Sequence, residues 1–175
     1  MNLAEMCSGV ERLSREVGAF IQEQRNSSVE IELKGLNNLV SRVDKNAETK
    51  FVEGLSKLLP EAGFIAEEGS ATHNNEEFLW VIDPLDGTTN YLHGIPAYCT
   101  SVALLQDRKP VIGVIYDPNQ DEMFAATAES EATMNGQPIR VTQRDLLQKS
   151  VLATGFPYDN LERQNQYIEL FGELC

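Results

Sequence analysis

Several residues with oxygen-bearing side chains lie close together in the middle of the chain, in the segment Asp83-Pro-Leu-Asp-Gly-Thr-Thr-Asn90. The apolar run 78–82 before them predicts a buried strand, and Pro84 is expected to stop that strand after Asp83. The tight turn would then direct the carboxylates of Asp83 and Asp86 into one space. Carboxylate oxygens at such spacing suit Mg²⁺, a hard cation that keeps several waters and binds substrate phosphate.

The residues after Asp86 predict a short helix, from Gly87 to His93. The first turn of a helix carries unpaired N–H groups and a partial positive charge, and it therefore binds anions such as phosphate. The segment would then combine a cation site with a phosphate cradle. The bare pattern D-P-x-D-G is explained about equally well by an Asp-Pro turn and an Asp-Gly turn, which are common in loops.

The rest of the chain supplies elements to position this segment. Apolar residues recur at helical spacing over residues 3–24 and 43–59, and Pro60 is expected to end the second helix. Two helices packed on an antiparallel meander give an α+β layered domain with a mainly antiparallel sheet. The expected strands cover residues 29–33, 63–66, 78–82, 99–106, 111–116, 122–126, a hairpin around Asn135-Gly136 and 150–154, and a last helix covers 160–174.

Composition narrows the classes of function. The length of 175 residues predicts one domain with a substantial core. The net charge of −13 argues against nucleic-acid binding, although metal ions can reverse the local field for a small phosphorylated ligand. Three cysteines without metal spacing indicate reduced thiols and a cytoplasmic location. No signal peptide and no membrane-length apolar run is present, so no membrane association is expected.

A longer string around the acidic segment, Trp80-Val-Ile-Asp-Pro-Leu-Asp-Gly-Thr-Thr-Asn-Tyr91, resembles the signature of the inositol monophosphatase family of Mg²⁺-dependent, lithium-sensitive phosphatases. Its tail differs from the D-G-T-K-E-F of 3′-phosphoadenosine 5′-phosphate phosphatases and from the D-G-S-S-N of fructose-1,6-bisphosphatases. Ala66-Glu67-Glu68 resembles the family's G-E-E motif, with Ala in place of the usual Gly. The resemblance covers nearly the whole chain and implies the layered sugar-phosphatase-like fold.

The resemblance implies a site that holds two or three Mg²⁺ ions and is inhibited by Li⁺. Asp83 would bridge two ions, Glu67 and the carbonyl of Leu85 would complete one of them, and Asp86 would bind the other. A metal-bound water would be the nucleophile, because a cation lowers the pKa of water. The implied metal ligands are therefore Glu67, Asp83, Leu85 and Asp86.

The same resemblance implies that Glu67 and Thr88 are catalytic residues, and that Asp44 orients Thr88. By itself, the position of Asp44 at the start of the second helix is explained by helix N-capping. Lys34 would lie in a loop near the active site, although a solvated loop charge is the simpler explanation for it. The implied substrate-binding set is Glu67, Leu85, Asp86, Gly87 and Thr88.

Family members also carry a C-terminal α/β region with a W-D-x-x-A-x-G motif, whose Asp is a further metal ligand. That motif does not occur here. The resemblance therefore predicts an N-terminal metal- and phosphate-binding domain over residues 1–158 and the start of a missing C-terminal α/β region at 159–175. Such a chain is expected to leave part of its sheet bare, to self-associate and to turn over slowly.

The resemblance implies a homodimer that hydrolyses a small phosphorylated polyol or sugar. Inositol 1-phosphate is the first choice, and histidinol phosphate, sugar phosphates and fructose 1,6-bisphosphate remain open. The alternative is a non-catalytic interaction protein that retains the phosphatase fold, for example a partner of the transcription machinery. Neither function calls for direct contact with nucleic acid or with a membrane.

Overall fold

The computed structural model describes residues 2–25, 31–33, 39–67, 76–155 and 163–174. They fall into two compact units, residues 1–32 with 39–140 and residues 33–38 with 141–175. The elements in chain order are α1 (Leu3–Gln24), β1 (Ile31–Leu33), β2 (Leu39–Ser41), α2 (Arg42–Leu58), β3 (Gly63–Ala66), β4 (Phe78–Asp86), α3 (Thr88–Leu92), β5 (Cys99–Gln106), β6 (Lys109–Asp117), β7 (Glu122–Thr127), β8 (Thr133–Met134), β9 (Gln137–Pro138), the 3₁₀ turn η1 (Leu147–Lys149) and α4 (Gln164–Leu174).

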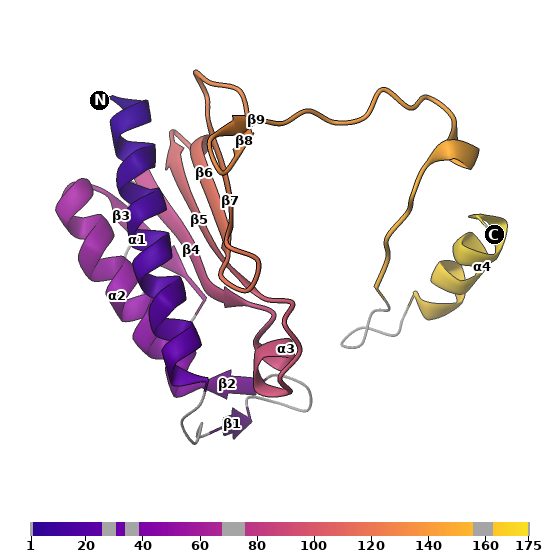
Figure 1. Ribbon diagram of the computed structural model, residues 1–175, viewed down its shortest axis with the longest axis horizontal. Helices are drawn as coiled ribbons and strands as arrows, with labels where there is room; N and C mark the ends of the chain where they lie inside the picture. The colour runs from indigo at the N-terminus through magenta and orange to yellow at the C-terminus, as the bar shows by residue number, and fades with distance from the viewer. Residues whose placement is uncertain (1, 26–30, 34–38, 68–75, 156–162, 175) are drawn as a thin grey trace. The chain divides into compact units, whose positions relative to one another are not determined.

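The centre of the first unit is a seven-stranded sheet with the strand order β3-β4-β5-β6-β7-β8-β9 (Figure 1). β3 runs parallel to β4, and the other neighbouring strands pair antiparallel. β1 and β2 form a separate two-stranded sheet. The prediction of an α+β fold with a mainly antiparallel sheet is therefore confirmed. No helix in the described part of the chain is both long and apolar enough to cross a membrane.

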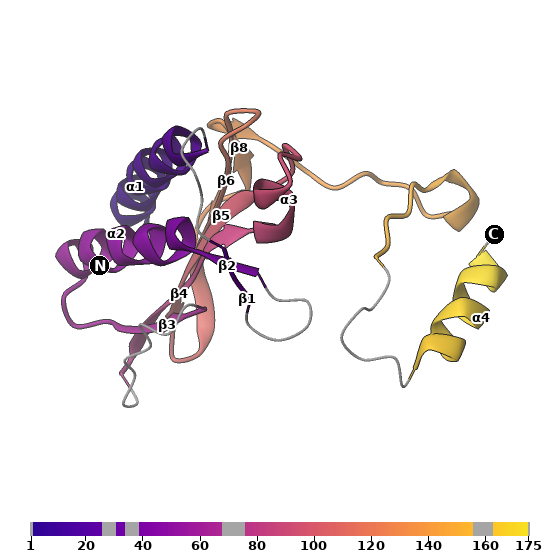
Figure 2. The same cartoon turned by 90° about the horizontal axis from the view of Figure 1, so that it is seen from below.

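α1 and α2 lie against one face of the sheet (Figures 1 and 2). α1 begins after Asn2, whose side-chain oxygen accepts a hydrogen bond from the backbone N–H of Glu5 at 3.2 Å. The helical spacing of apolar residues places Ile21 of α1 and Phe51 of α2 in the core, where both are 0% exposed together with Trp80 of β4. Each such side chain contributes about 1.5–3 kcal/mol on burial. One apolar cluster thus joins both helices to the strand that carries the acidic segment.

Two hairpins form as the sequence predicts. Asp107 and Arg108, between β5 and β6, have φ of 48° and 64°, and Asn135 and Gly136, between β8 and β9, have φ of 49° and 75°. Two consecutive residues with positive φ make a turn whose twist matches that of the flanking strands. The side chain of Asn135 also accepts a hydrogen bond from the N–H of Met123 at 2.9 Å, which ties this hairpin to β7.

Three expectations were wrong in detail. The strand before the acidic segment does not end at Asp83, because β4 passes through Pro84 and pairs again at Asp86 after a register shift. The second helix begins at Arg42, so Asp44 lies in its first turn and is not the N-cap. Residues 150–154 form no strand and follow the 3₁₀ turn η1. They are exposed, so water can satisfy their backbone groups without a partner strand.

The remaining boundaries agree closely, since α1 and β5 match their predicted ranges and β6 and β7 extend theirs by one or two residues. The strand predicted at 29–33 is seen as β1, and its residues 29 and 30 lie outside the described residues. The last helix is α4, and residues 160–162 of its predicted range also lie outside them.

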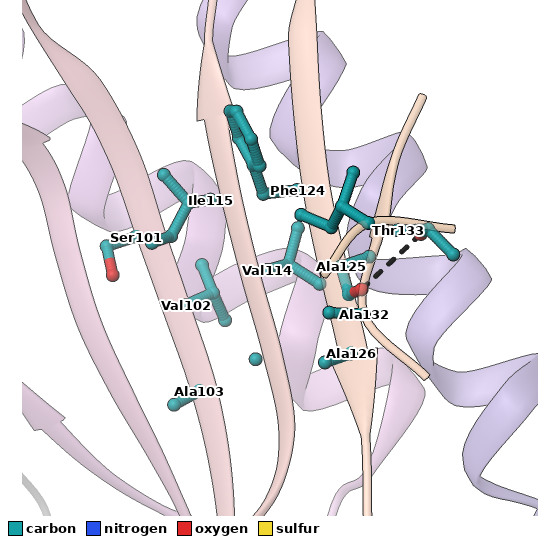
Figure 3. Close-up of a pocket in the computed structure, with 12 residues that line it drawn as sticks. Ser101, Val102, Ala103, Val114, Ile115, Phe124, Ala125, Ala126, Ala132 and Thr133 are labelled. Carbon is teal, nitrogen blue, oxygen red and sulfur yellow. Dashed lines mark hydrogen bonds between the residues drawn. The ribbon is translucent and has the colours of Figure 1, made fainter. Parts of the chain in front are cut away.

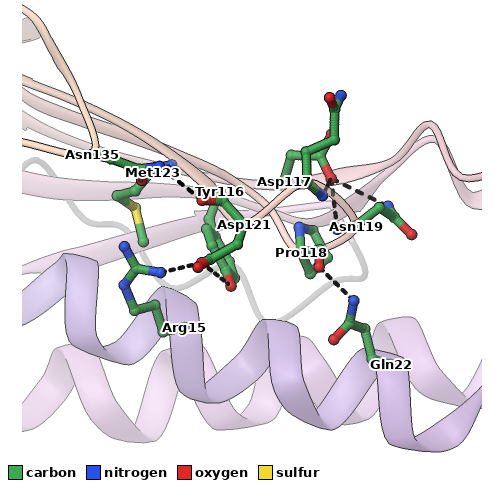
Figure 4. Close-up of polar contacts among 10 residues, drawn as sticks. Arg15, Gln22, Tyr116, Asp117, Pro118, Asn119, Asp121, Met123 and Asn135 are labelled. Carbon is green, nitrogen blue, oxygen red and sulfur yellow. Dashed lines mark hydrogen bonds and ion pairs between the residues drawn. The ribbon is translucent and has the colours of Figure 1, made fainter.

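Polar contacts fasten α1 to the turn between β6 and β7 (Figure 4). The guanidinium of Arg15 donates to the carboxylate of Asp121 and lies over the ring of Tyr116, 5.2 Å from its centroid. The hydroxyl of Tyr116 donates to Asp121 Oδ1 at 3.0 Å, and the amide of Gln22 donates to the carbonyl of Pro118. The Tyr116 ring is thereby held against the helix.

Gly18 of α1 faces that ring, and Gly18→Ala is expected to destabilise the protein. A Cβ at this position would lie 2.6 Å from Tyr116 Cε1 and 3.3 Å from Pro118 Cβ. Separating helix and sheet should lower the free energy of unfolding by about 1–3 kcal/mol, which outweighs the better helix propensity of Ala. Urea denaturation measures the difference, with Gly172→Ala in α4 as the control, because its Cβ would meet nothing within 4 Å. Unchanged stability of Gly18→Ala would contradict the close approach.

The face of the sheet that α1 and α2 do not cover is apolar and hollowed (Figure 3). A groove of about 360 Å³ runs across β5, β6 and β7, with small residues such as Ala103, Gly113 and Ala126 along it and the larger Ile115 and Phe124 at its side. Within the first unit, Ile115 is 44% exposed on this face. Ser101 of β5 lines this groove and pairs with Asp83 of β4, so Asp83 lies on the same face of the sheet.

Candidate active site

A β-bulge brings the two aspartates of the segment to one face of the sheet. Asp83 pairs with Ser101 and Asp86 pairs with Cys99, so three steps along β4 match two steps along β5. Residues three apart in a regular strand point to opposite faces, and one extra residue restores the same face. Pro84 lies within the bulge, where its lack of an N–H interrupts no ladder hydrogen bond.

Glu67 joins the two aspartates because β3 and β4 are parallel. Ala66 at the end of β3 pairs with Ile82 of β4, so Glu67, the next residue of the chain, comes beside Asp83. The pKa of Asp83 is raised from 3.8 to about 7, first by burial and then by the charges of Glu67 and Asp86 and a side-chain hydrogen bond with Glu67. Three of the predicted site residues therefore lie within electrostatic reach of one another.

Backbone groups of the bulge are held by short-range hydrogen bonds. Asp83 Oδ1 accepts from the N–H of Leu85 at 3.2 Å, and the hydroxyl of Thr88 donates to the carbonyl of Leu85 at 3.0 Å. Gly87 caps the five-residue helix α3 with φ of 91°, a conformation that favours glycine. The predicted ligand atoms of Leu85 and the predicted phosphate cradle thus belong to one ordered turn.

The donor set fits a hard cation, although it is not a preformed cage. Among the described residues, no group of three or more His, Cys, Asp or Glu side chains is arranged to hold a metal ion. Mg²⁺ does not require such a cage, since it is commonly held by one or two carboxylates together with waters and substrate phosphates. Burial and then repulsion from Glu67 and Asp86 raise the pKa of Asp83, and a divalent cation would relieve that repulsion.

Asp44 and Lys34 are the two remaining predicted site residues, and of these only Asp44 is among the described residues. Asp44 is 2% exposed in the first turn of α2. Burial first, then Tyr98 and the charge of Asp44, raise the pKa of Tyr91, a residue of α3. Asp44 therefore lies near the helix that carries Thr88, and its pairing with Thr88 stays a prediction. Lys34 and the second residue of the Glu67-Glu68 pair lie outside the described residues.

Two residues near the site were missed by the sequence analysis. Cys99 Sγ lies 3.9 Å from Asp86 Oδ2, and burial together with the charges of Asp86, Asp83 and Asp117 raises the pKa of this thiol to about 11. The charge of Asp117, at the end of β6, therefore reaches the thiol that lies beside Asp86. No local motif marks either residue, because the strand register alone brings them to Asp86.

The stability of the metal-free protein is expected to fall as the pH rises, because of Asp83. Its folded pKa of about 7 exceeds the ordinary value of 3.8, so the folded state binds the proton more tightly. The stabilisation is complete below pH 4 and is lost as the pH passes through 7. Asp83→Asn is neutral at every pH and should raise the melting temperature by a few degrees at pH 8 in a chelator, and by less at pH 4. A constant difference across this pH range would contradict the shared carboxylate site.

The fold and the cluster of Glu67, Asp83 and Asp86 define a layered α+β protein whose acidic groups converge where a bulged strand ends. The sequence profile of the inositol monophosphatase family matches residues 2–174, and the chain belongs to this family. "Inositol monophosphatase 3" of Solanum lycopersicum is 38% identical over 145 residues, 81% of this chain and 54% of the relative. "Nus factor SuhB" of Escherichia coli (strain K12) is 35% identical over 166 residues, 93% of this chain and 62% of the relative.

Solved structures agree with this assignment. The extragenic suppressor protein suhB from Bartonella henselae superposes with a TM-score of 0.89 at 34% identity, covering 95% of this chain and 65% of the other. The inositol monophosphatase from Anabaena sp. PCC 7120 gives a TM-score of 0.80 at 34% identity, covering 97% of this chain and 65% of the other. The chain thus spans between about half and two thirds of the length of these relatives.

Proposed function

We propose that the protein is an Mg²⁺-dependent phosphomonoester hydrolase that acts on inositol monophosphate or a related polyol or sugar phosphate. The observation that carries the proposal is the convergence of Glu67, Asp83 and Asp86, whose charges add to the effect of burial and raise the pKa of Asp83 to about 7. Carboxylates that repel one another beside an ordered Gly-Thr turn suit the joint binding of a divalent cation and a phosphate. Relatives named inositol monophosphatases support the substrate class.

In this proposal Glu67, Asp83, Asp86 and the carbonyl of Leu85 hold the cation, which supplies Lewis acidity and an activated water. The N–H groups of Gly87 and Thr88 hold the phosphate. Glu67 accepts the proton of the attacking water, and the hydroxyl of Thr88, anchored on Leu85 at 3.0 Å, fixes the position of that water. No Ser, Cys or His nucleophile is required, because water attacks phosphorus directly.

Phosphate release from inositol 1-phosphate, measured with Mg²⁺ and with a chelator, tests the proposal. We expect hydrolysis that requires Mg²⁺ and that Li⁺ inhibits. Histidinol phosphate, sugar phosphates and fructose 1,6-bisphosphate in the same panel assign the substrate. Hydrolysis that persists undiminished in the chelator would contradict a metal-activated water.

The second candidate function is a non-catalytic interaction protein that retains the phosphatase fold. The relative from Escherichia coli that is 35% identical over 166 residues is named as a Nus factor, and this favours a protein partner in the transcription machinery. The two candidates separate in one pair of measurements. Binding to a transcription protein that does not need metal, together with no phosphate release, would favour the second function over the first.

A further inference from the structure

Two hydrogen bonds join the end of α1 to the segment that contains α3. In the core, the hydroxyl of Tyr91 donates to the carbonyl of Ile21 at 3.0 Å. Nearer the surface, the guanidinium of Arg25 donates to the carbonyl of Gly94 at 2.8 Å. The proposed mechanism gives neither Tyr91 nor Arg25 a role, although Tyr91 belongs to the same short helix as Thr88.

The bond between Tyr91 and Ile21 satisfies two buried groups at once. Ile21 lies in the last turn of α1, where carbonyls lack intrahelical partners, and the N–H of Arg25 bonds to the carbonyl of Gln22 at 3.2 Å. Tyr91 is 3% exposed, so its hydroxyl depends on this carbonyl for a partner. Its ring also meets the ring of Tyr98 edge-on, with the centroids 5.1 Å apart. The side chain of Tyr91 is therefore fixed against the end of α1.

A short path leads from this anchor to Thr88. The N–H of Tyr91 donates to the carbonyl of Gly87 at 3.0 Å, so the anchored residue lies one helical turn from the start of α3. α3 has only five residues, and a helix of that length has little stability of its own. Its position therefore depends on tertiary contacts such as the one that Tyr91 makes.

We propose that Tyr91 is a positioning residue for Thr88, and that Arg25 supports it from the surface. The last turn of α1 is a fixed point, because Ile21 is fully buried in the core. Through α3, the hydroxyl of Tyr91 holds Thr88 where the Thr88 hydroxyl bonds to the carbonyl of Leu85 and fixes the attacking water. This inference rests on the proposed function, in which Thr88 positions that water.

Tyr91→Phe tests the inference, because it removes the hydroxyl and keeps the ring. Tyr116→Phe is the matched control, since Tyr116 also packs against α1 and its hydroxyl donates to Asp121 at 3.0 Å, away from the proposed mechanism. At a temperature where circular dichroism shows both variants folded, kcat for inositol 1-phosphate should fall about tenfold in Tyr91→Phe and less than about twofold in Tyr116→Phe. KM should change less than about threefold in both, because the lost interaction acts on the attacking water and not on the bound ester.

Amide hydrogen exchange in the metal-free protein tests the same anchor without hydrolysis. Loss of the bond to Ile21 should speed exchange of the Tyr91 N–H by about tenfold, because α3 then opens more often. Tyr116→Phe should leave this rate unchanged. Arg25→Met removes only the donor to Gly94, so it should change kcat and exchange in the same direction by less, and it decides the question if Tyr91→Phe does not fold.

The outcomes separate this inference from the proposed function. Unchanged kcat in Tyr91→Phe, or an equal loss of kcat in both Tyr→Phe variants, would overturn the inference while phosphate release by the unaltered protein upholds the function. Faster exchange confined to Tyr91→Phe, in a protein that releases no phosphate, would retain Tyr91 as the residue that positions Thr88 and reject the proposed function.

Discussion

Replacement of Asp83 by Asn is expected to abolish phosphate release. Asp83 is the residue on which the charges of Glu67 and Asp86 converge, and in the proposed function it is one of the carboxylates that would hold the cation. The amide is nearly isosteric and neutral, so the cluster would hold a divalent cation far more weakly. We expect kcat/KM to fall by at least about 10³-fold, the scale of losing one essential stabiliser of charge in the transition state. Colorimetric phosphate assays in Mg²⁺ measure this loss.

The fold of this variant should persist, because Asp83 is half-buried and its surroundings raise its pKa, so they disfavour the charged form and accept a neutral amide. Asp107→Asn provides a matched control, since it makes the same chemical change in the turn between β5 and β6. Asp107 has φ of 48°, a conformation that Asn tolerates well. Wild-type activity in Asp83→Asn, or an equal loss in Asp107→Asn, would show that the proposed metal centre is wrong.

The helices and the central hairpins were predictable because their signals are local. The apolar stripe of α1 has one helical period from Leu3 to Ile21, and no competing pattern interrupts it. The turn at Asn135-Gly136 is specified by its own two residues, since both adopt positive φ. Where backbone conformation depends only on residues that are near in sequence, the amino-acid sequence was sufficient to predict it.

The site itself depends on a feature that the sequence did not reveal. Pro84 was expected to end the strand, whereas the strand continues through it as a bulge. A proline has no N–H to lose at an unpaired position, so a bulge and a strand end are equally compatible with it. The bulge is what places Asp83 and Asp86 on one face, and its presence is decided by pairing with Ser101 and Cys99 of β5.

The positions of Asp44 and Asp117 also depend on contacts with residues far away in sequence, which the sequence did not reveal. Capping preferences suggested that Asp44 precedes its helix, but the helix begins two residues earlier and Asp44 is 2% exposed. A carboxylate so deeply buried is placed by its tertiary contacts, and helix propensity carries no information about them. Asp117 comes near Cys99 through the register of β5 with β6, which is a long-range property of the sheet.

Gly87→Ala is expected to disrupt the turn that joins Asp86 to Thr88. Gly87 has φ of 91°, and an added Cβ would lie 2.8 Å from the carbonyl oxygen of Ala97. That oxygen is held by the amide of Asn90 at 2.7 Å, so it cannot easily move away. Backbone strain and the clash together should lower the free energy of unfolding by about 2–5 kcal/mol. The displaced turn should also lower the rate of phosphate release from the folded protein by about 10²-fold.

Gly94→Ala separates the two causes. Gly94 also has positive φ, 75°, but its Cβ would meet only Arg25 Nη2 at 3.9 Å, so this variant bears the backbone strain without the clash. It should lose about 1–2 kcal/mol and keep most of its activity. Urea denaturation and phosphate release, measured on both variants, compare them directly. If Gly87→Ala loses no more stability or activity than Gly94→Ala, the close approach of Gly87 to Ala97 does not shape the site, and the phosphate must be held by other groups than the Gly87-Thr88 turn.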